Sequence, residues 1–479
     1  MPYIGLDLGT TSITAILLET GTGDVLVKHS VSNDTETTSA DQITGGRSEW
    51  DIDGMVSKTI SVLKSVAADA TDRWTIDGIG VTGQQHGMVL LGRDGRPRTP
   101  FIGWQDRRCH EHHKDGKTYL ENMVAMGGRG FTRSECFPAR GYMGASLFWL
   151  SQNRMLPDGA VASFAPDYLV GRLCDEDPVT DPTNAGGSGL YDVIEGRWNT
   201  DLLLSLGIPQ SVLPSVQGSC SWAGKLSGRL ASEICIPAGT PVTNACGDNQ
   251  ASFAGSVSNY KNSLLINIGT GGQISVYSKG AIRIEGMLVR PYLKSGYLLV
   301  GAGMTGGRSY SVLERFIQAV GEEIFGVKPK DTIYDRLNEL ATSISAGSDD
   351  LVCEPVFTGS LSEPGRRGQF SGINDTNLTP GHMARSLLEG MARQFCRMYD
   401  RMKSAGVVPR THFIGAGNGV RKNALLGNIL SDTFGMPLNI VNHGEEAATG
   451  AALSAAVASE EFSDIGEAGS RCITYNTFD

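Results

Sequence analysis

The sequence predicts an α/β protein built from two domains of related architecture. Segments with strand and helix patterns alternate along 479 residues, a length that suits two or three domains. A hairpin pattern around a Gly-Thr turn opens the chain and returns in its second half, where Asn267-Ile268-Gly269-Thr270 matches Asp7-Leu8-Gly9-Thr10. We therefore expect an N-terminal domain of residues 1–255 and a C-terminal domain of residues 256–479, with the hinge near residues 254–262, where Gly, Ser and Asn cluster.

Each expected element follows from its local pattern. Residues 3–8 and 12–18 alternate apolar residues with small or polar ones, which predicts the two strands of the first hairpin. Short apolar runs bounded by turn residues predict further strands at 76–82, 241–246 and 412–416. Helical spacing of apolar residues predicts helices at 161–174, 249–256, 309–320, 383–402 and 423–433.

The composition describes a globular chain and excludes several classes of function. Lys and Arg number 41 against 51 Asp and Glu, the net charge is −10, and no long basic run occurs, so no nucleic-acid partner is expected. The 9 Cys form no CxxC pair and no Cys/His cluster, which favours reduced thiols over zinc or disulfides. No apolar stretch approaches the ~20 residues that span a bilayer, and the first strand follows without a signal peptide. The prediction is a cytoplasmic protein with no membrane partner.

The turn of the first hairpin has the residues of a phosphate-binding loop. Asp7 ends the strand, Gly9 lets a ligand approach the backbone, and the hydroxyl residues Thr10, Thr11 and Ser12 follow as donors for phosphate oxygens. The Asp7 carboxylate is a candidate Mg²⁺ ligand, directly or through water, since Mg²⁺ prefers oxygen ligands and keeps several waters. A plain hairpin turn explains the same residues about equally well when this loop is considered alone.

Three further glycine-rich turns are candidates for the same nucleotide site. Gly269 and Thr270 repeat the Gly-Thr dipeptide, and two such hairpins could face each other across one triphosphate. Gly417 and Asn418 lie between an expected strand and a helix, an arrangement that suits a nucleoside site. Gly307 closes a similar glycine-rich run. The last two turns are weak signals alone, since glycine-rich turns between strands and helices are common.

Asp248 is the candidate catalytic base. It stands between a short buried strand and a helix, in the run Gly247-Asp248-Asn249. Asp is a favoured N-cap residue, and this structural role is compatible with a catalytic one. In phosphoryl transfer, the base mainly orients the attacking hydroxyl and takes its proton late, so a carboxylate of ordinary basicity suffices. Asn249 beside it is a candidate substrate ligand.

Two polar segments suit the recognition of a polyol. Gln85 and His86 follow an expected strand, and Trp104 and Asp106 offer an aromatic face and a carboxylate close together. A sugar is bound by such a combination of a stacking surface with hydrogen-bonding groups. The structural alternative is that His86 is a satisfied turn residue and that Asp106 pairs with one of the two arginines after it. Without other context, this alternative is the favoured one.

Taken in order, these segments resemble the FGGY family of carbohydrate kinases across nearly the whole chain. The motifs that carry the resemblance are DLGTTS at 7–12, GQQHG at 83–87, WQDRR at 104–108, GDNQAS at 247–252, NIGTGG at 267–272, GAGNGVRKN at 415–423 and EEAATGAAL at 445–453. The resemblance implies the two-domain, actin-like ATPase fold of the ribonuclease H-like class, with an interdomain cleft for ATP and sugar. It also implies that Asp248 is the base, that Asp7 lies near Mg²⁺, and that ATP and Mg²⁺ are the cofactors.

The resemblance implies roles for the remaining candidates and a substrate class. The family's phosphate loops correspond to Thr11 and Thr270 here. Its adenine site corresponds to Gly417 and Asn418. Its ketose site corresponds to Gln85, His86 and Asp106. The Trp-Gln-Asp motif and the segment at 181–192 are more similar to sedoheptulokinases than to xylulokinases. This favours a phosphotransferase with an alcohol acceptor, acting on a sedoheptulose-type ketose. Xylulose or another pentulose or polyol is the alternative substrate.

Two hypotheses from other classes are kept beside the kinase. A chaperone-like ATPase of the same fold would share the phosphate loops but would have no need of the polyol motifs. A sugar-sensing pseudokinase would not need Asp7, Thr11 and Asp248, which this chain has. The expected partners are therefore a small sugar and ATP, and a homodimer is kept as an open alternative to a monomer.

Overall fold

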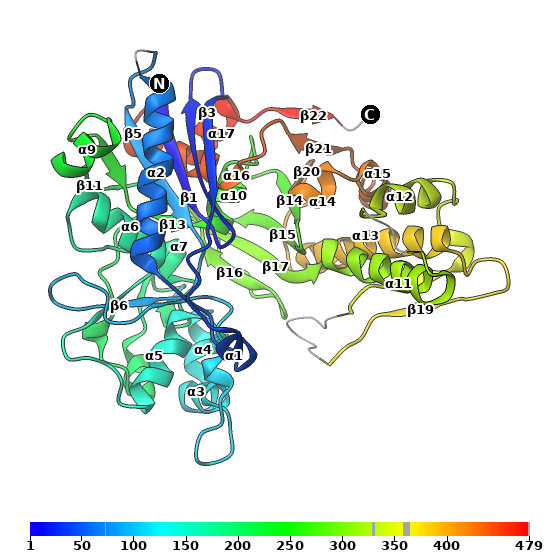
Figure 1. The fold of residues 1–479 in the computed structure, drawn as a ribbon, viewed down its shortest axis with the longest axis horizontal. Helices are drawn as coiled ribbons and strands as arrows, with labels where there is room; N and C mark the ends of the chain where they lie inside the picture. The colour runs from blue at the N-terminus through cyan, green and yellow to red at the C-terminus, as the bar shows by residue number, and fades with distance from the viewer. Residues whose placement is uncertain (72, 328–330, 358–364, 478–479) are drawn as a thin grey trace.

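The computed structural model describes residues 1–71, 73–327, 331–357 and 365–477. Two lobes lie side by side along the long axis of the molecule, and each is built on a seven-stranded sheet (Figure 1). The division into two α/β domains is confirmed by this architecture. The boundary between residues 255 and 256 falls in the turn between the two sheets and stays a prediction.

The two sheets repeat one arrangement of strands. The first has the order β11 (Trp222–Lys225), β12 (Pro241–Thr243), β5 (Gly78–Gly83), β1 (Pro2–Leu8), β2 (Ser12–Glu19) and β3 (Asp24–Ser32), with β13 (Cys246–Gly247) beside β5. The second has the order β22 (Tyr475–Thr477), β21 (Leu438–Val441), β20 (His412–Ala416), β14 (Ser263–Ile268), β15 (Gly271–Ser278), β17 (Tyr297–Thr305) and β16 (Leu288–Pro291). In each sheet the first hairpin is antiparallel, and its first strand pairs in parallel with a strand from much later in the chain. The sequence repeat is therefore a repeat of topology.

Helices cover the outer face of each sheet because their apolar stripes complete the cores. On the first sheet these are α2 (Ile52–Ala70), α6 (Ala165–Cys174) and α9 (Gly228–Ile234). On the second they are α13 (Pro380–Ser404) and α15 (Ala424–Phe434). Both long helices start on a cap: the Asp51 side chain accepts from Gly54 N–H before α2, and Thr379 accepts from His382 N–H before α13.

Two predicted elements differ from the structure. The helix expected at 161–174 begins only at Ala165, because Val161–Ser163 forms strand β8 and pairs with β6 (Val89–Leu91). That strand partner is distant in sequence, so local periodicity gave no sign of it. The strand expected at 241–246 is divided into β12 and β13, because the side chain of Asn244 turns away to hydrogen-bond the carbonyl of Gly218.

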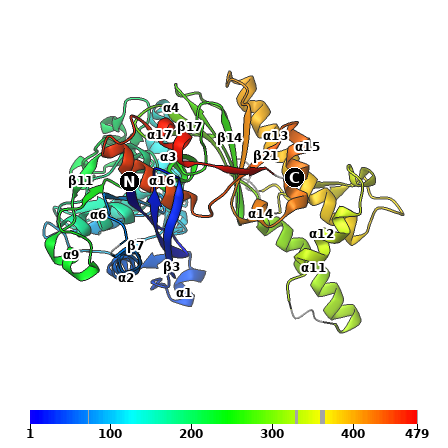
Figure 2. The same cartoon turned by 90° about the horizontal axis from the view of Figure 1, so that it is seen from above.

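A late helix joins the two lobes. α16 (Glu446–Ala458) belongs to the second half of the chain but packs on the inner face of the first lobe together with α17 (Ile465–Cys472) (Figure 2). The residues of α16 are buried without a break from Ala448 to Val457. The core around it takes side chains from both sheets and from α10 (Asp248–Ala254), among them Tyr3, Phe253, Leu265, Ile414 and Leu453.

Glycines make this interdomain contact possible. A Cβ built on Gly5 in β1 would lie 1.8 Å from the carbonyl oxygen of Ala448, and one on Gly80 in β5 would lie 1.8 Å from that of Ala451. On the other side of α16, a Cβ on Gly450 would lie 1.9 Å from the carbonyl oxygen of Ala251 in α10. Helix α16 therefore rests directly on the backbone of its neighbours.

The substitution Gly80→Ala should destabilise the protein by roughly 1–3 kcal/mol or more, because the added methyl overlaps backbone that cannot move without separating the lobes. Gly228→Ala is the matched control, since a Cβ at Gly228 meets nothing within 4 Å. Thermal unfolding of the two variants beside the parent measures the difference. Equal melting temperatures for all three proteins would contradict this description of the contact.

Candidate functional site

Three loops leave the first sheet at the same edge. Leu8 in β1 lies opposite Gly83 in β5, and Gly83 lies opposite Gly247 in β13, all in parallel register. Because parallel strands end on the same side of a sheet, the loop after Leu8, the segment after Gly83 and the start of α10 lie side by side. This register brings Asp7 and Asp248 to one point, although they are far apart in the sequence.

Asp248 is the first residue of α10, and its carboxyl is bound by backbone donors. Asn249 N–H donates to Asp248 Oδ1 at 2.8 Å, and Gln85 N–H donates to the same carboxyl. Burial raises the pKa of Asp248 to about 6, and these hydrogen bonds oppose the rise. A carboxylate with such a pKa can take a proton near neutral pH, as a general base in a cleft requires.

Asp7 lies beside Asp248 and has the properties of a cation ligand. Burial raises the pKa of Asp7 to about 7, with further contributions from the negative charges of Asp248 and Glu445. Its Oδ1 is buried and has no hydrogen-bond partner among the described residues. An orphaned carboxylate oxygen among other carboxylates fits an Mg²⁺ ion, which also neutralises their repulsion.

The protein itself supplies few ligands for such an ion. Among the described residues, no group of three or more His, Cys, Asp or Glu side chains is arranged to hold a metal. Mg²⁺ commonly takes one or two carboxylates and completes its shell with waters and phosphate oxygens. Asp7 therefore fits Mg²⁺ that arrives with a nucleotide better than an ion bound by protein alone.

Hydrogen bonds hold the first part of the loop after β1, and two hydroxyl groups that follow it have no partner in the described ranges. Asn33 Nδ2 donates to the carbonyl of Gly9 at 2.9 Å and holds the turn. Thr10 Oγ1 donates to Gln84 Oε1 at 3.3 Å and accepts from Trp104 Nε1 at 3.0 Å. Thr11 is exposed and Ser12 is half-buried, and neither side chain hydrogen-bonds another residue in the described ranges. Their hydroxyls are the ones available to a phosphate.

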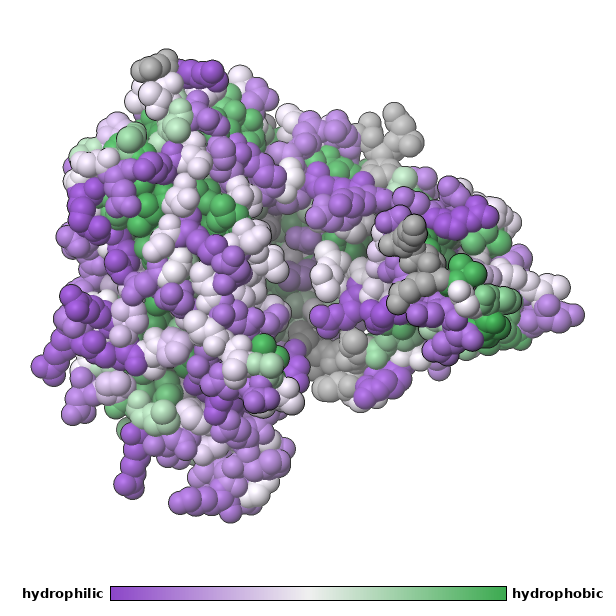
Figure 3. All heavy atoms as spheres, in the orientation of Figure 1, coloured by the Kyte–Doolittle hydropathy of each residue, from purple (hydrophilic) through white to green (hydrophobic). Residues whose placement is uncertain are grey.

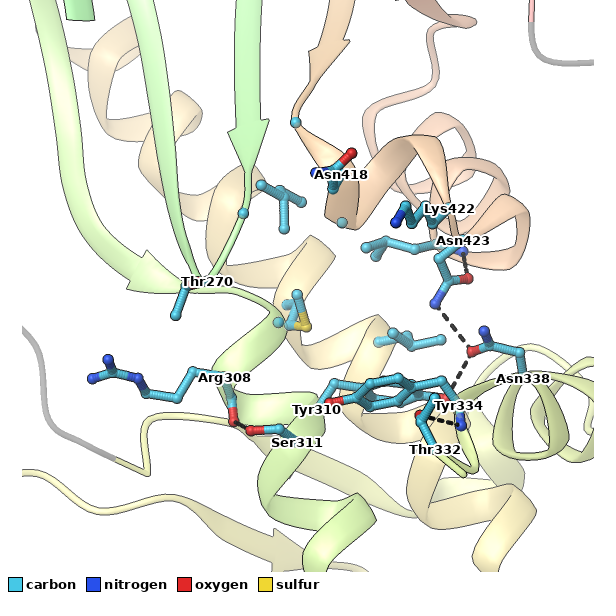
Figure 4. Close-up of a pocket in the computed structure, with 18 of the residues that line it drawn as sticks. Thr270, Arg308, Tyr310, Ser311, Thr332, Tyr334, Asn338, Asn418, Lys422 and Asn423 are labelled. Atoms are coloured by element: carbon cyan, nitrogen blue, oxygen red, sulfur yellow. Dashed lines mark hydrogen bonds between the residues drawn. The ribbon is translucent and has the colours of Figure 1, made fainter. Parts of the chain in front are cut away.

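The second lobe holds a cavity of about 920 Å³ at the corresponding edge of its sheet (Figure 4). Asn267 in β14 lies opposite Ala416 in β20, so the turns that follow these strands are neighbours. The cavity brings together all five candidates that the sequence offered from this half of the chain, which are Gly269, Thr270, Gly307, Gly417 and Asn418. The turns interlock, since Gly307 N–H donates to the carbonyl of Gly269 at 2.9 Å.

Gly417 is required by this packing. Its φ of 85° lies in the left-handed region, and a Cβ there would come within 2.6 Å of the carbonyl oxygen of Ile268. The turn before α14 (Asn418–Arg421) consequently lies directly against the end of β14. Gly417, Asn418 and Gly419 of this turn line the cavity.

The sequence did not single out the aromatic wall of the cavity. The rings of Tyr310 and Tyr334 stack with centroids 5.7 Å apart and planes 16° from parallel. Tyr310 Oη donates to Asn338 Oδ1 at 2.8 Å, and Asn423 Nδ2 donates to the same oxygen at 3.0 Å (Figure 4). Tyr310 lies on the helix predicted at 309–320. Its hydroxyl, which needs a hydrogen-bond partner when buried, was the signal in the sequence that could have pointed to it. Tyr334 and Asn338 lie on α12 (Tyr334–Thr342), which was not predicted.

A side-chain contact ties the two halves of the site together. Asn249 Nδ2 donates to Gln273 Oε1, which joins α10 to β15 just after the Gly269-Thr270 turn. Asn249 Oδ1 is buried and has no partner in the described part of the chain. Asp248 therefore lies next to the phosphate turn of the second lobe, and the molecular surface is hollowed between the two lobes (Figure 3).

Besides Asn249, the sequence predicts four side chains that bind sugar, and these fall into two groups. His86 is half-buried and Trp104 is 37% exposed, so both present surface toward a ligand. Gln85 is buried, and its Nε2 donates to the carbonyl of Thr183 at 2.9 Å and to Gln250 Oε1 at 3.0 Å. Both amide hydrogens of Gln85 are used within the protein, where they hold the backbone that binds Asp248.

Asp106 forms an ion pair with Arg108, which is the alternative to sugar binding that the sequence left open. It is 1% exposed, and its two oxygens accept four hydrogen bonds, from the backbone N–H and guanidinium of Arg108 and from the backbone N–H of Ser48. No lone pair remains for a sugar hydroxyl, which corrects the expected direct contact. The ion pair instead fixes the backbone of the segment that carries Trp104.

Comparison with known proteins now identifies the family. The N-terminal domain of the FGGY family of carbohydrate kinases matches residues 2–255, and its C-terminal domain matches residues 265–459. The chain belongs to the FGGY family of carbohydrate kinases. It is thus an ATP-dependent phosphotransferase that uses an alcohol group of a carbohydrate as the acceptor.

Individual FGGY proteins resemble the chain at modest identity. Sedoheptulokinase from Mus musculus is 27% identical, with 94% of this chain and 96% of the relative covered. Xylulose kinase from Staphylococcus xylosus is 25% identical, with 99% and 94% covered. The crystal structure of xylulose kinase from Rhodospirillum rubrum superposes with a TM-score of 0.86 at 25% identity, covering 99% of this chain and 93% of that one. The two-domain FGGY fold is confirmed, and these relatives do not favour the chaperone-like ATPase.

The FGGY kinase has no transmembrane segment in the part that the structure describes: none of its helices there combines the required length and apolar character.

The substitution Asp248→Asn should lower kcat by about 10²–10⁴-fold, because an amide cannot take the proton of the attacking hydroxyl. ATP binding should survive, since the cavity that holds the expected nucleotide-binding turns lies in the other lobe. Coupled ADP-release assays and ATP titration calorimetry measure the two effects. Asp201→Asn, in the first turn of the remote helix α8 (Thr200–Leu206), is the control. Near-normal turnover of the Asp248 variant would refute its assignment as the base.

The substitution Tyr334→Ala should raise the KM for ATP by about tenfold, because an adenine ring that rests on the tyrosine pair would lose its stacking surface. Tyr334→Phe keeps the ring and should leave the KM unchanged. Initial-rate kinetics at saturating sugar distinguish the variants. An unchanged KM for ATP in both variants would show that the adenine ring binds elsewhere.

Proposed function

We propose that this kinase phosphorylates a ketose of the sedoheptulose class, with Asp248 as the base. The observation that carries the proposal is the pair of half-buried carboxyls, Asp7 and Asp248, at the edge of the first sheet, next to the Asn249–Gln273 contact with the second lobe. Their raised pKa values mark a site built to exchange a proton and to bind a cation.

ATP is assigned to the cavity of the second lobe. The adenine lies against Tyr310 and Tyr334, and the Gly417-Asn418 turn borders the same adenine site. The triphosphate then runs toward the first lobe, between Thr270 on one side and the free hydroxyls of Thr11 and Ser12 on the other. Glycine turns suit this position because phosphate oxygens can approach the backbone N–H groups closely.

Asp7 is assigned to Mg²⁺. The ion, when bound with the nucleotide, neutralises charge on the phosphate oxygens and on the leaving group. Asp7 Oδ1 is the free protein ligand, and Glu445 adds negative charge nearby. Burial, with added repulsion from Asp248 and Glu445, raises the pKa of Asp7, and a bound cation would offset both effects.

The sugar is assigned to the first lobe. Its reacting hydroxyl lies at Asp248, with His86, Asn249 and the exposed ring of Trp104 around the chain of hydroxyls. The amide of Gln85 contributes by holding the backbone that binds Asp248. As the hydroxyl oxygen attacks the γ-phosphorus, the bond from that phosphorus to the bridging oxygen of ADP breaks, and Asp248 receives the hydroxyl proton.

Closure of the lobes completes this arrangement. The Asn249–Gln273 contact already joins the helix of the base to the strand after the phosphate turn. A closed cleft excludes water, which would otherwise compete with the sugar for the γ-phosphoryl group. A cytoplasmic location and a homodimer stay predictions.

The sedoheptulose class is supported by the Trp104-Gln105-Asp106 motif and by the 27% identity of this chain to the mouse sedoheptulokinase. The identity to the xylulose kinase, 25%, is similar. The two substrates differ in chain length, and both offer the hydroxyls that the site requires. Xylulose is therefore retained as the alternative.

The experiment that tests the substrate class is an ADP-release screen over four- to seven-carbon ketoses and polyols. We expect kcat/KM for sedoheptulose to exceed that for xylulose by about tenfold or more. The reverse order would establish the alternative. ADP release that no sugar accelerates would contradict both and would favour the chaperone-like ATPase.

A further inference from the structure

Arg290 is a buried arginine of the second lobe that reaches into the first. It lies on the edge strand β16 and is 5% exposed. Its Nη2 donates to Tyr142 Oη at 2.7 Å, and its Nη1 donates to the carbonyl of Gly186. Across the described ranges, no carboxylate forms an ion pair with it. Burying a guanidinium without a counter-charge is unfavourable, so its position calls for a reason other than stability.

Arg290 binds Tyr142 and the Gly186-Gly187 turn, and both also contact His86. The ring of Tyr142 stacks on the imidazole of His86, with centroids 3.9 Å apart and planes 10° from parallel. His86 Nδ1 lies 2.7 Å from the carbonyl oxygen of Gly187, the residue after Gly186. Arg290 therefore fixes both the stacking partner of the imidazole and the turn to which it is hydrogen-bonded.

This geometry defines which ring nitrogen carries the proton. A carbonyl oxygen only accepts hydrogen bonds, so Nδ1 of His86 must be the N–H. In the neutral ring, Nε2 then has a lone pair and can only accept. No residue in the described ranges hydrogen-bonds Nε2, and the side chain is only half-buried. Nε2 is thus the nitrogen of His86 that remains available as an acceptor for a ligand.

Burial keeps the imidazole of His86 neutral, and the charge of Arg290 adds to this effect. Burial lowers the pKa of His86 to about 3, the positive charge of Arg290 contributes, and the hydrogen bond to Gly187 opposes. The other titratable groups around this cluster are Tyr142, at the start of α5 (Met143–Gln152), and Cys136, whose thiol pKa is raised to about 11 by burial. Neither supplies a negative charge that would favour protonation.

We propose that Arg290 is a positioning residue for sugar recognition: through Tyr142 and the Gly186-Gly187 turn, it holds His86 as the Nδ1–H tautomer with Nε2 as an acceptor. The inference rests on the proposed function, because the donor to Nε2 is a hydroxyl of the sugar. The site thereby selects a hydroxyl at this point. A keto or carboxylate oxygen, which can only accept, is disfavoured there.

The test combines histidine ¹⁵N spectra with kinetics. In the parent protein, the His86 resonances, assigned from a His86→Gln variant, should show protonated Nδ1 and bare Nε2 with no titration down to pH 5. In Arg290→Met, His86 should populate the other tautomer or begin to titrate within this range. The KM for the sugar should rise by about tenfold, the loss expected for one hydrogen bond, while the KM for ATP stays unchanged.

Arg283→Met is the matched control. Arg283 also comes from the second lobe and binds the first, at Glu135 and the carbonyl of Thr132, but it does not contact the His86 cluster. If Arg290→Met fails to fold, Arg290→Lys is used: it keeps the charge but loses the fork, so His86 should stay neutral while the sugar KM rises several-fold.

Three results would overturn the proposal. One is a parent spectrum with a protonated Nε2, and another is an Arg290 variant whose His86 spectrum and sugar KM match those of the Arg283 control. The third is a changed tautomer with an unchanged sugar KM, which would remove Nε2 from substrate recognition. Failure of the proposed function looks different: no sugar is phosphorylated by the parent, while the His86 spectra still report the tautomer.

Discussion

Helix α16 lies on strands β1 and β5 with no room for a side chain between them. Gly5 and Gly80 meet the carbonyls of Ala448 and Ala451 at distances that only a hydrogen atom fits. The same helix meets α10 through Gly450. The catalytic candidate Asp248 begins α10, so a helix from the second half of the chain determines where the carboxylate of the first lobe sits. The interdomain core and the site are products of one contact.

The site concentrates negative charge where the protein also withholds water. Asp7, Asp248 and Glu445 approach one another at the edge of the first sheet, and the pKa values of Asp7 and Asp248 rise to about 7 and about 6. Such an arrangement costs stability in the absence of a cation and becomes favourable when a metal and a nucleotide arrive. Function and stability are therefore opposed at this edge, and the close-packed helices around it supply the rigidity that keeps the carboxyls together.

Many of the polar side chains near the proposed sugar site form hydrogen bonds within the protein and are not free to bind a ligand. The backbone N–H of Gln85 donates to the Asp248 carboxyl, and its side-chain amide donates to Thr183 and Gln250. Asp106 accepts its hydrogen bonds from Arg108 and Ser48. Arg290 crosses from the other lobe to hold Tyr142. These residues lie within family motifs or beside them. The groups left free for substrate include His86 Nε2, Asn249 Oδ1, the face of Trp104 and the carboxyl of Asp248.

The sequence by itself determined the local features: the two hairpins, the helices with apolar stripes, and the glycine turns that suit phosphate. These depend on residue spacing within a few turns of the chain, which periodicity and turn chemistry report directly. Only the tertiary structure decided which distant residues meet. The stacking of Tyr310 on Tyr334, the saturation of Asp106 and the reach of Arg290 to Tyr142 arise from register and packing between segments far apart in the chain. Parallel pairing of β1, β5 and β13 belongs to the same class, because the pairing of strands depends on contacts that no local window of sequence contains.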